Sequence, residues 1–276
     1  MNKLRRILVA TPLWAWMLAF TVIPMLLIVY YAFSDGSGGF TTEYLMTAIK
    51  NADYWKSILL SFRHALLSTV ICLLVGYPAA YLLSRMKNGG GAFVLLLFML
   101  PMWMNFLIRT YALKSILEKG GFLDGLMVKL GLQSGLLINS DFAVIVGMVY
   151  NFLPFLILPI YTSLCKIDEH LIEASHDLGA NGFVTFTRLY LPLTMPGIVS
   201  GITMVFVPAV TTFIIPQMLN NTYMTIGSLI EYKFKQEVSF TGISGTGSAL
   251  SLILMVVVIL IMMLVNAVDK EGDSAL

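Results

Sequence analysis

The chain alternates long apolar runs with short polar connections. Six of the runs reach the roughly 17 to 25 residues that an α-helix needs to cross the hydrocarbon core of a membrane. They extend over residues 7–33, 58–83, 92–116, 142–164, 193–215 and 248–268. This pattern predicts an all-α integral membrane protein whose residues 1–276 form a single transmembrane domain of six transmembrane helices.

A polar loop over residues 165–192 separates the fourth and fifth runs, and its spacing predicts two short helices. Asp168 is a suitable N-cap for the first helix, and Gly179 is suited to end it. Asn181 can cap the second helix, after which Pro192 opens the next span. Two interpretations follow from this pattern: a docking face for a partner at the membrane surface, or an interfacial helix that rests on lipid.

The distribution of Lys and Arg predicts the orientation in the membrane. The first run follows Lys3, Arg5 and Arg6 and is longer than the apolar core of about 7 to 15 residues in a cleavable signal peptide, so we expect it to remain as a span. With the N-terminus inside, eight basic residues lie in inner segments and six in outer ones. This bias predicts that both termini and the loop over residues 165–192 are cytoplasmic.

Composition narrows the function classes. Charged residues make up 12% of the chain, about half the usual share in soluble domains, and the mean hydropathy is +0.86. A formal charge of +2 without a long basic run gives no sign of nucleic-acid binding. The cysteines and histidines lack the spacing of metal ligands, so we expect no metal site. The glycine-rich segment 242–248 lacks the lysine of a phosphate-binding loop, so we expect no cofactor in this chain.

The polar loop also carries a family pattern. It contains Glu173, Ala174 and Ser175 in succession, then Gly179, Leu189, Leu191 and Pro192. This order resembles the EAA loop of bacterial ATP-binding-cassette importer permeases, which reads Glu-Ala-Ala, three residues, Gly, nine residues, Ile, one residue and Leu-Pro. Ser175 replaces the second alanine of that pattern, and Leu189 replaces the isoleucine.

Further stretches resemble one branch of these permeases, the B subunits of spermidine/putrescine importers. They are Gly76-Tyr77-Pro78-Ala79, Asn105 to Tyr111, Leu153-Pro154-Phe155, Asp177 to Ala180, and Pro192 to Gly197. The resemblance implies a permease subunit that moves polyamines into the cytoplasm across a bacterial cytoplasmic membrane and is not itself an enzyme. Permeases for other small cations or metabolites share the scaffold, so that alternative stays open.

The resemblance also implies a set of partners. They would be a second permease subunit, a dimer of ATP-binding-cassette ATPases that binds the ATP, an extracellular or periplasmic polyamine-binding protein, and the lipid bilayer. The polar loop would then act as a cytoplasmic coupling loop. In it Glu173 would dock against the ATPase, Ala174 would allow close approach, and Gly179 would supply a sharp turn.

Polar residues inside the spans are further candidates, because ionisable groups in a membrane are costly. Arg109 is one of them, and we expect it to pair with an acid such as Asp141 or Glu231. A cationic cargo could pass along aromatic faces by cation–π contacts of about 0.5 to 2 kcal/mol each, although anchoring at the membrane interface is the alternative for any such residue. The candidate pathway or intramembrane polar residues are Arg109, Asn105, Trp103, Tyr111, Tyr150 and Glu231.

An intramembrane protease and a secondary transporter are the two alternatives to this interpretation. Gly242-Ile243-Ser244-Gly245 is similar to the motif of rhomboid proteases, but no histidine follows His176 to activate the serine, so we expect no catalytic residues. A self-contained secondary transporter would show intramembrane acids and paired repeats with broken helices. Neither is visible in the sequence, and this class remains the alternative.

Overall fold

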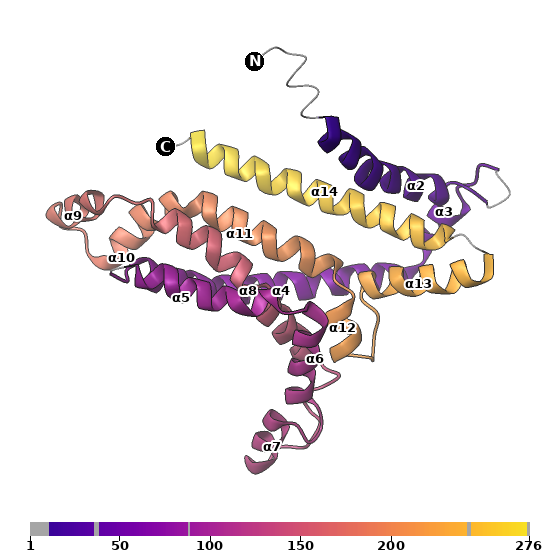
Figure 1. Ribbon diagram of the computed structural model, residues 1–276, viewed down its shortest axis with the longest axis horizontal. Helices are drawn as coiled ribbons and strands as arrows, with labels where there is room; N and C mark the ends of the chain where they lie inside the picture. The colour runs from indigo at the N-terminus through magenta and orange to yellow at the C-terminus, as the bar shows by residue number, and fades with distance from the viewer. Residues whose placement is uncertain (1–10, 36–38, 88, 242–243, 275–276) are drawn as a thin grey trace. The chain divides into compact units, whose positions relative to one another are not determined.

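The computed structural model describes residues 11–35, 39–87, 89–241 and 244–274, and most of them are helical (Figure 1). Within these ranges, five helical segments are long and apolar enough to cross a membrane, and one bent pair makes a sixth candidate. The five are Thr11–Ala32, Ala52–Ser84, Asp141–Leu164, Gly182–Thr211 and Gly245–Met263. The predicted all-α membrane fold is confirmed.

The helices follow one another with short connections. In chain order they are η1 (Leu18–Val22), α2 (Ile23–Ala32), α3 (Glu43–Lys50), α4 (Ala52–Ser84), α5 (Gly90–Met99), η2 (Leu100–Trp103), α6 (Phe106–Leu117), α7 (Phe122–Lys129), α8 (Asp141–Leu164), α9 (Glu169–Asp177), α10 (Gly182–Thr185), η3 (Phe186–Tyr190), α11 (Leu191–Thr211), α12 (Ile214–Leu219), α13 (Ile226–Thr241) and α14 (Gly245–Ser274). Residues 7–10 of the predicted first span, the basic residues before it, and Gly242 and Ile243 of the glycine-rich segment lie outside the described residues.

The chain forms two compact units. The first contains Met1–Lys56 and Leu229–Val257, and the second contains Ser57–Ser228 and Val258–Leu276. The single domain expected from the sequence stays a prediction.

In the first unit, close packing surrounds the start of α14. A β-carbon added at Gly245 would lie 2.5 Å from ring atoms of Tyr44, and one at Gly247 would lie 3.0 Å from the ring of Phe234. Glu237 accepts hydrogen bonds from the Ser244 hydroxyl at 3.0 Å and from the backbone N–H of Thr246 at 3.1 Å. Gly245 and Gly247 therefore allow aromatic rings to pack directly against the backbone of α14.

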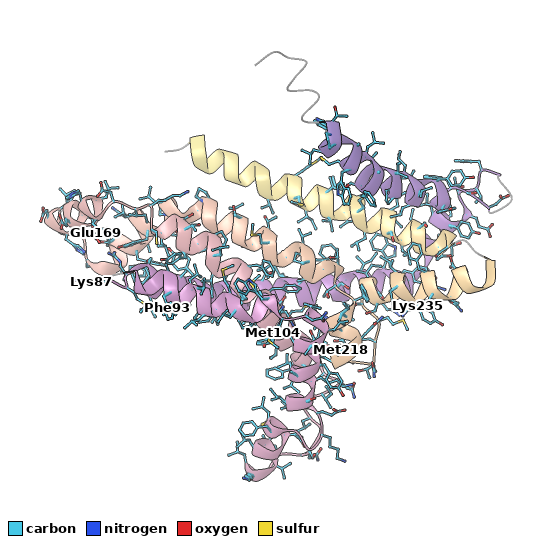
Figure 2. The ribbon with its side chains drawn as sticks, in the orientation of Figure 1. Lys87, Phe93, Met104, Glu169, Met218 and Lys235 are labelled. Carbon is cyan, nitrogen blue, oxygen red and sulfur yellow. The ribbon has the colours of Figure 1, made fainter. Side chains whose placement is uncertain are left out.

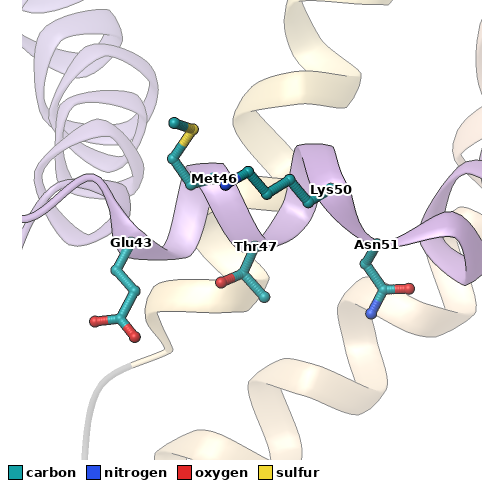
Figure 3. Close-up of a pocket in the computed structure, with 5 residues that line it drawn as sticks. All are labelled: Glu43, Met46, Thr47, Lys50 and Asn51. Carbon is teal, nitrogen blue, oxygen red and sulfur yellow. The ribbon is translucent and has the colours of Figure 1, made fainter.

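A shallow groove runs along α3 in the same unit. Figure 3 shows the five residues that line it, namely Glu43, Met46, Thr47, Lys50 and Asn51. All five come from α3 and the residue that ends it, so the groove is open and lies along one helix.

The core of the second unit is built by α4, α8 and α11. Small residues let these helices approach closely, as is common between membrane helices. On α11, a β-carbon added at Gly197 would lie 2.6 Å from the carbonyl oxygen of Pro159, and one at Gly201 would lie 3.2 Å from that of Leu156. On α4, a β-carbon at Gly76 would lie 2.7 Å from the side chain of Leu156. The backbone of α11 is thus pressed directly against α8.

The third predicted span, residues 92–116, is not one straight helix. Gly90–Trp103 and Phe106–Lys129 form the bent pair, and they meet at 94°. Asn105 accepts a hydrogen bond from the backbone N–H of Leu107 at 2.9 Å, so it caps a new helix. The apolar composition of this stretch favoured a continuous span because a helix cap inside an apolar run leaves no mark on hydropathy.

The predicted boundaries at the fifth span are also wrong. The helical segment Gly182–Thr211 is continuous, so the second loop helix and the span are one element rather than two. It ends at Thr211 instead of residue 215, and α12 follows as a separate short helix. Pro192 is the second residue of α11, which follows η3, a π-helical turn. The wider turn moves the preceding carbonyls, so the proline ring fits without breaking the helix.

Candidate functional site

The first predicted loop helix is present as α9. Its N-cap, Asp168, accepts a hydrogen bond from the backbone N–H of His170 at 3.0 Å, and Glu169 places a negative charge in the first turn. Figure 2 shows Glu169 at the tip of the second unit, close to Lys87. The predicted cap and helix are confirmed.

The end of α9 depends on Gly179. This residue has φ +81°, a left-handed conformation that side chains disfavour. The backbone N–H of Gly179 donates to His176 at 2.9 Å, and that of Ala180 donates to Ser175 at 3.0 Å. These bonds satisfy carbonyls at the helix end and turn the chain sharply toward α10.

The outward side of α9 is free of packing within the described part of the chain. None of its residues is buried. Leu171 is 48% exposed, and Leu178, which follows the helix, is 89% exposed. Glu173 and Ala174 are exposed too, and the only ion pair recorded for Glu173 among described residues is with exposed His170 at 3.5 Å. This side is therefore an unpartnered surface of mixed apolar and acidic character.

The inward side of α9 is fixed to the next helix by Ser175. Its hydroxyl donates to the carbonyl of Ile172 at 2.8 Å and lies 3.2 Å from the hydroxyl of Thr185 on α10. Thr185 is only 3% exposed. Because α10, η3 and α11 form one helix, α9 is joined through Ser175 to a span.

A polar cleft of about 180 Å³ lies beside the start of α9. It is lined by Ser84, Arg85, Leu164, Cys165, Ile167, Glu169, Ile172 and Tyr190. The guanidinium carbon of Arg85 lies 5.1 Å from the ring centre of Tyr190 and 5.5 Å from that of Tyr81. The end of α4 is therefore in contact with η3. Sequence reasoning missed Arg85, Tyr190 and Thr185, because each contributes through a contact with a distant segment.

The remaining predicted loop residues lie on the continuous helix. Leu189 is half-buried in η3, Leu191 is 37% exposed at the start of α11, and Pro192 is half-buried next to it. Two residues later, Thr194 is buried and lies 3.0 Å from the hydroxyl of Tyr77 on α4. This part of the family pattern thus lies where the span joins the core.

The expectation that Arg109 pairs with Asp141 is wrong. Arg109 is 5% exposed, and its Nε donates to Oδ1 of Asn151 on α8 at 2.8 Å. Its Nη1 donates to the carbonyl of Pro101 at 3.2 Å, across the bend between η2 and α6. The guanidinium also lies 5.8 Å from the ring centre of Tyr150. The guanidinium of Arg109 therefore contacts neutral oxygen acceptors and an aromatic ring, where an acidic side chain was expected.

Asp141 instead belongs to a polar cluster at the N-terminal end of α8. It forms an ion pair with Arg63 and lies 3.3 Å from Nε2 of His64 on α4. The hydroxyl of Tyr223, in the loop after α12, donates to Asp141 at 2.5 Å. Burial raises the pKa of Tyr223, so the hydroxyl stays protonated and able to donate. The cluster joins α4, α8 and this loop.

The other pathway candidates differ in their local surroundings. Asn105 caps α6, while Trp103 is 79% and Tyr111 62% exposed. Tyr150 is 44% exposed beside Arg109. Glu231, in the first unit, forms an ion pair with Lys235 one helical turn away. Among the described residues, no group of three or more His, Cys, Asp or Glu side chains could hold a metal ion.

Comparison with known proteins identifies the family. The family model described as "Binding-protein-dependent transport system inner membrane component" matches residues 74–271. The chain is 37% identical over 241 residues to the spermidine/putrescine transport system permease protein PotB of Haemophilus influenzae, covering 84% of each chain. It is 32% identical over 247 residues to PotB of Escherichia coli K12, covering 87% of this chain and 90% of that one.

Solved structures share the fold. A bacterial ABC transporter involved in the import of the acidic polysaccharide alginate has a chain that matches with a TM-score of 0.70 and 17% identity, covering 97% of this chain and 98% of that chain. The MetNI methionine ABC transporter matches with a TM-score of 0.55 and 17% identity, covering 80% and 95%. At this identity the likeness concerns the fold alone. Because the family model spans well over half of the sequence, the chain belongs to the inner membrane components of binding-protein-dependent transport systems.

Proposed function

We propose that this chain is the membrane-spanning permease subunit of an ATP-binding-cassette importer that moves spermidine and putrescine into the cytoplasm. The observation that carries the proposal is the identity of 37% to a spermidine/putrescine permease over 84% of the chain. The curated relatives are transport permeases, and the chain itself is proposed to have no enzymatic activity. ATP would be bound and hydrolysed by a partner.

The coupling step is proposed to use α9. A cytoplasmic ATPase dimer would receive this helix in a groove, with Glu173 at its surface and Ala174 permitting close approach. The exposed side of α9 supports this role, with the apolar residues Leu171 in the helix and Leu178 directly after it. Gly179 would keep the turn to α10 sharp, so that α9 stands clear of the helix that follows.

The route of the motion is also proposed. ATP binding would draw α9 together with its counterpart on a second permease subunit. Gly182–Thr211 is continuous, so a displacement of α10 would reach α11 without passing a flexible joint. Leu189, Leu191 and Pro192 would transmit it where the helix enters the core. Close packing of Gly197 and Gly201 against α8 favours movement of both helices as one body between two states.

The passage of the cargo is proposed to rely on an aromatic face. Tyr150 remains partly exposed beside Arg109 and would contact an ammonium group by cation–π interaction, whereas Trp103 and Tyr111 take the alternative role of anchors at the membrane interface. Arg109 and Asn105 would shape this region, because both stabilise the bend between η2 and α6. Glu231 is proposed as an acidic residue at the entrance.

The remaining partners and the location follow from the same proposal. A family defined by dependence on a binding protein implies such a partner, here proposed to bind polyamines outside the cytoplasmic membrane. The chain would be a multi-pass protein of a bacterial cytoplasmic membrane, with both termini and α9 in the cytoplasm. The second permease subunit would complete the pathway.

Uptake by proteoliposomes tests the proposal. The vesicles hold this chain, the second permease, the ATPase and the binding protein, with or without enclosed ATP. We expect labelled spermidine and putrescine to accumulate only with ATP. Glu173→Arg, in the middle of α9, should abolish uptake, while the matched exchange Glu169→Arg at the first residue of the helix should weaken it less.

Three results would change the assignment. If polyamines stay outside while another solute with its binding protein stimulates ATP hydrolysis, the cargo is wrong and the importer class survives. If the chain moves solute without any ATPase, a secondary transporter is the correct class. If Glu173→Arg leaves ATP-driven uptake intact, Glu173 has no part in coupling.

A further inference from the structure

We infer that the segment from α6 to α7, Phe106–Lys129, is an arm with an apolar exposed surface that lies in the lipid interface, in the leaflet farther from α9. We call it the α6–α7 arm. It was expected to form the second half of a span and a following loop. The inference goes beyond the transport function and does not depend on the cargo.

The direction of the arm is the first argument. In Figure 1, α5 runs alongside α8, which has the length and composition of a span, while α6 leaves it at a steep angle. The bend between the two halves is 94°. A helix packed along the spans points across the membrane, so a turn of about a right angle sends the next helix into the membrane plane.

The depth of the arm is the second argument. Ten residues of α5 and four of η2 precede the bend, a length of roughly 23 Å at helical rises of about 1.5 and 2 Å per residue. The α5–η2 segment starts shortly after Lys87. Figure 2 shows Lys87 at the α9 end of the unit and Met104 at the bend. The hydrocarbon core is about 30 Å thick, so α6 begins roughly 7 Å short of its far side. Helices that lie in the membrane interface are buried to a similar depth of about 5–10 Å.

The surface of the arm is the third argument. Its exposed side chains are largely apolar, and they continue just beyond α7. They are Leu107, Ile108, Tyr111, Ile116, Phe122, Leu123, Leu126, Val128 and, after the helix, Leu130. Leu130 is 78% exposed and Phe122 is 73% exposed. A stretch of this composition would be costly to leave in water.

The polar groups of the arm are arranged as lipid requires. Asp124 is 2% exposed, and its carboxylate accepts hydrogen bonds from the backbone N–H of Gly120 at 2.8 Å and of Gly135 at 2.6 Å. The hydroxyl of Ser134 donates to it at 2.7 Å. The carboxylate therefore has its hydrogen-bond partners within the protein, and these bonds join α7 to the segments before and after it.

The residues at the edges of the arm favour lipid over a protein partner. Trp103 at the bend and Tyr111 on α6 are exposed aromatic residues of the kind that gathers at membrane interfaces. Lys114, Lys119 and Lys129 stand along the arm, where their long side chains can reach the headgroups. Lysine is depleted in the buried centre of protein–protein interfaces.

Spin-label accessibility in the assembled transporter, reconstituted in lipid nanodiscs, tests the inference. Exposed Cys165 is replaced by serine, and buried Cys72 is retained. Single cysteines for labelling are introduced by Leu130→Cys directly after the arm, Leu74→Cys on the exposed side of α4, and Lys87→Cys at the charged turn. Collision rates are measured with oxygen, which concentrates in lipid, and with a water-soluble nickel chelate.

We expect oxygen to dominate severalfold at position 130, as at position 74, with the opposite order at position 87. The apparent depth at position 130 should fall between those of the two controls. Dominance of the nickel chelate at position 130 would place the arm in water and overturn the inference. Low rates with both reagents would show that a protein subunit covers the arm, which also overturns it.

Discussion

Arg109 Nε lies 2.8 Å from Oδ1 of Asn151, and this bond holds a buried guanidinium against the middle of α8. Asn151 is itself 0% exposed and donates to the carbonyl of Gly147 at 2.8 Å. The same guanidinium reaches back to Pro101 across the bend. One side chain thus joins η2, α6 and α8.

Replacing Asn151 by leucine should destabilise the protein clearly. The change removes the acceptor of Arg109 and leaves a buried charged donor unpaired, at a cost of about 1–3 kcal/mol. Asn151→Asp keeps an acceptor for Arg109 and adds a negative charge beside it, but loses the hydrogen bond to Gly147, so it should lose less stability than Asn151→Leu. Thermal unfolding in detergent compares the two variants. Equal losses in both would show that Asn151 acts through packing alone.

Gly179→Ala should loosen α9 without altering any contact. A β-carbon at Gly179 meets nothing within 4 Å, and the same holds for Gly182, but only Gly179 has a positive φ. The left-handed conformation costs an alanine about 1 kcal/mol more than a glycine. Hydrogen exchange of the α9 amides should therefore accelerate in Gly179→Ala and stay unchanged in Gly182→Ala. Similar rates in both variants would exclude backbone strain as the role of Gly179.

Gly197→Ala should weaken the packing of α11 on α8. The added methyl group would lie 2.6 Å from the carbonyl oxygen of Pro159, a backbone atom that cannot turn away. Overpacking of this kind costs about 1–3 kcal/mol. Ser200→Ala, at an exposed position of the same helix, is the matched control and should be neutral. The measurement compares the melting temperatures of the two variants. A Gly197→Ala protein as stable as the control would contradict the close approach of α11 to α8 at this residue.

Alkaline pH should reveal the burial of Tyr223. Burial raises its pKa from the ordinary value of 10.0, so the folded state favours the protonated hydroxyl that donates to Asp141. The contribution to stability is complete below pH 10.0 and is lost as the pH rises through the higher pKa of the folded state. Unfolding measured from neutral to alkaline pH should show a steeper loss for the unchanged protein than for Tyr223→Phe. Parallel curves of stability against pH for the two proteins would mean that the Tyr223 hydroxyl does not contribute to the alkaline loss of stability.

The parts of the site that depend on neighbours in sequence could be predicted. Asp168 caps α9 and Gly179 ends it because a cap and a left-handed turn are local properties of a few residues. The bend at Asn105 was missed, since a single polar residue barely lowers the average hydropathy of a span-length apolar run. Pro192 was taken as the start of a span for a similar reason, because a π-turn that accommodates proline has no clear signal in sequence.

The sequence by itself determined the membrane class, the helical architecture and the position of α9, because hydropathy and helix caps are expressed within a few turns of chain. Only the tertiary structure decided that Arg109 bonds to Asn151, that Ser175 meets Thr185, and that α6 leaves the direction of the spans. These relationships join residues from different helices or redirect a helix as a whole. They depend on which faces meet when the helices pack, and no local pattern encodes that choice.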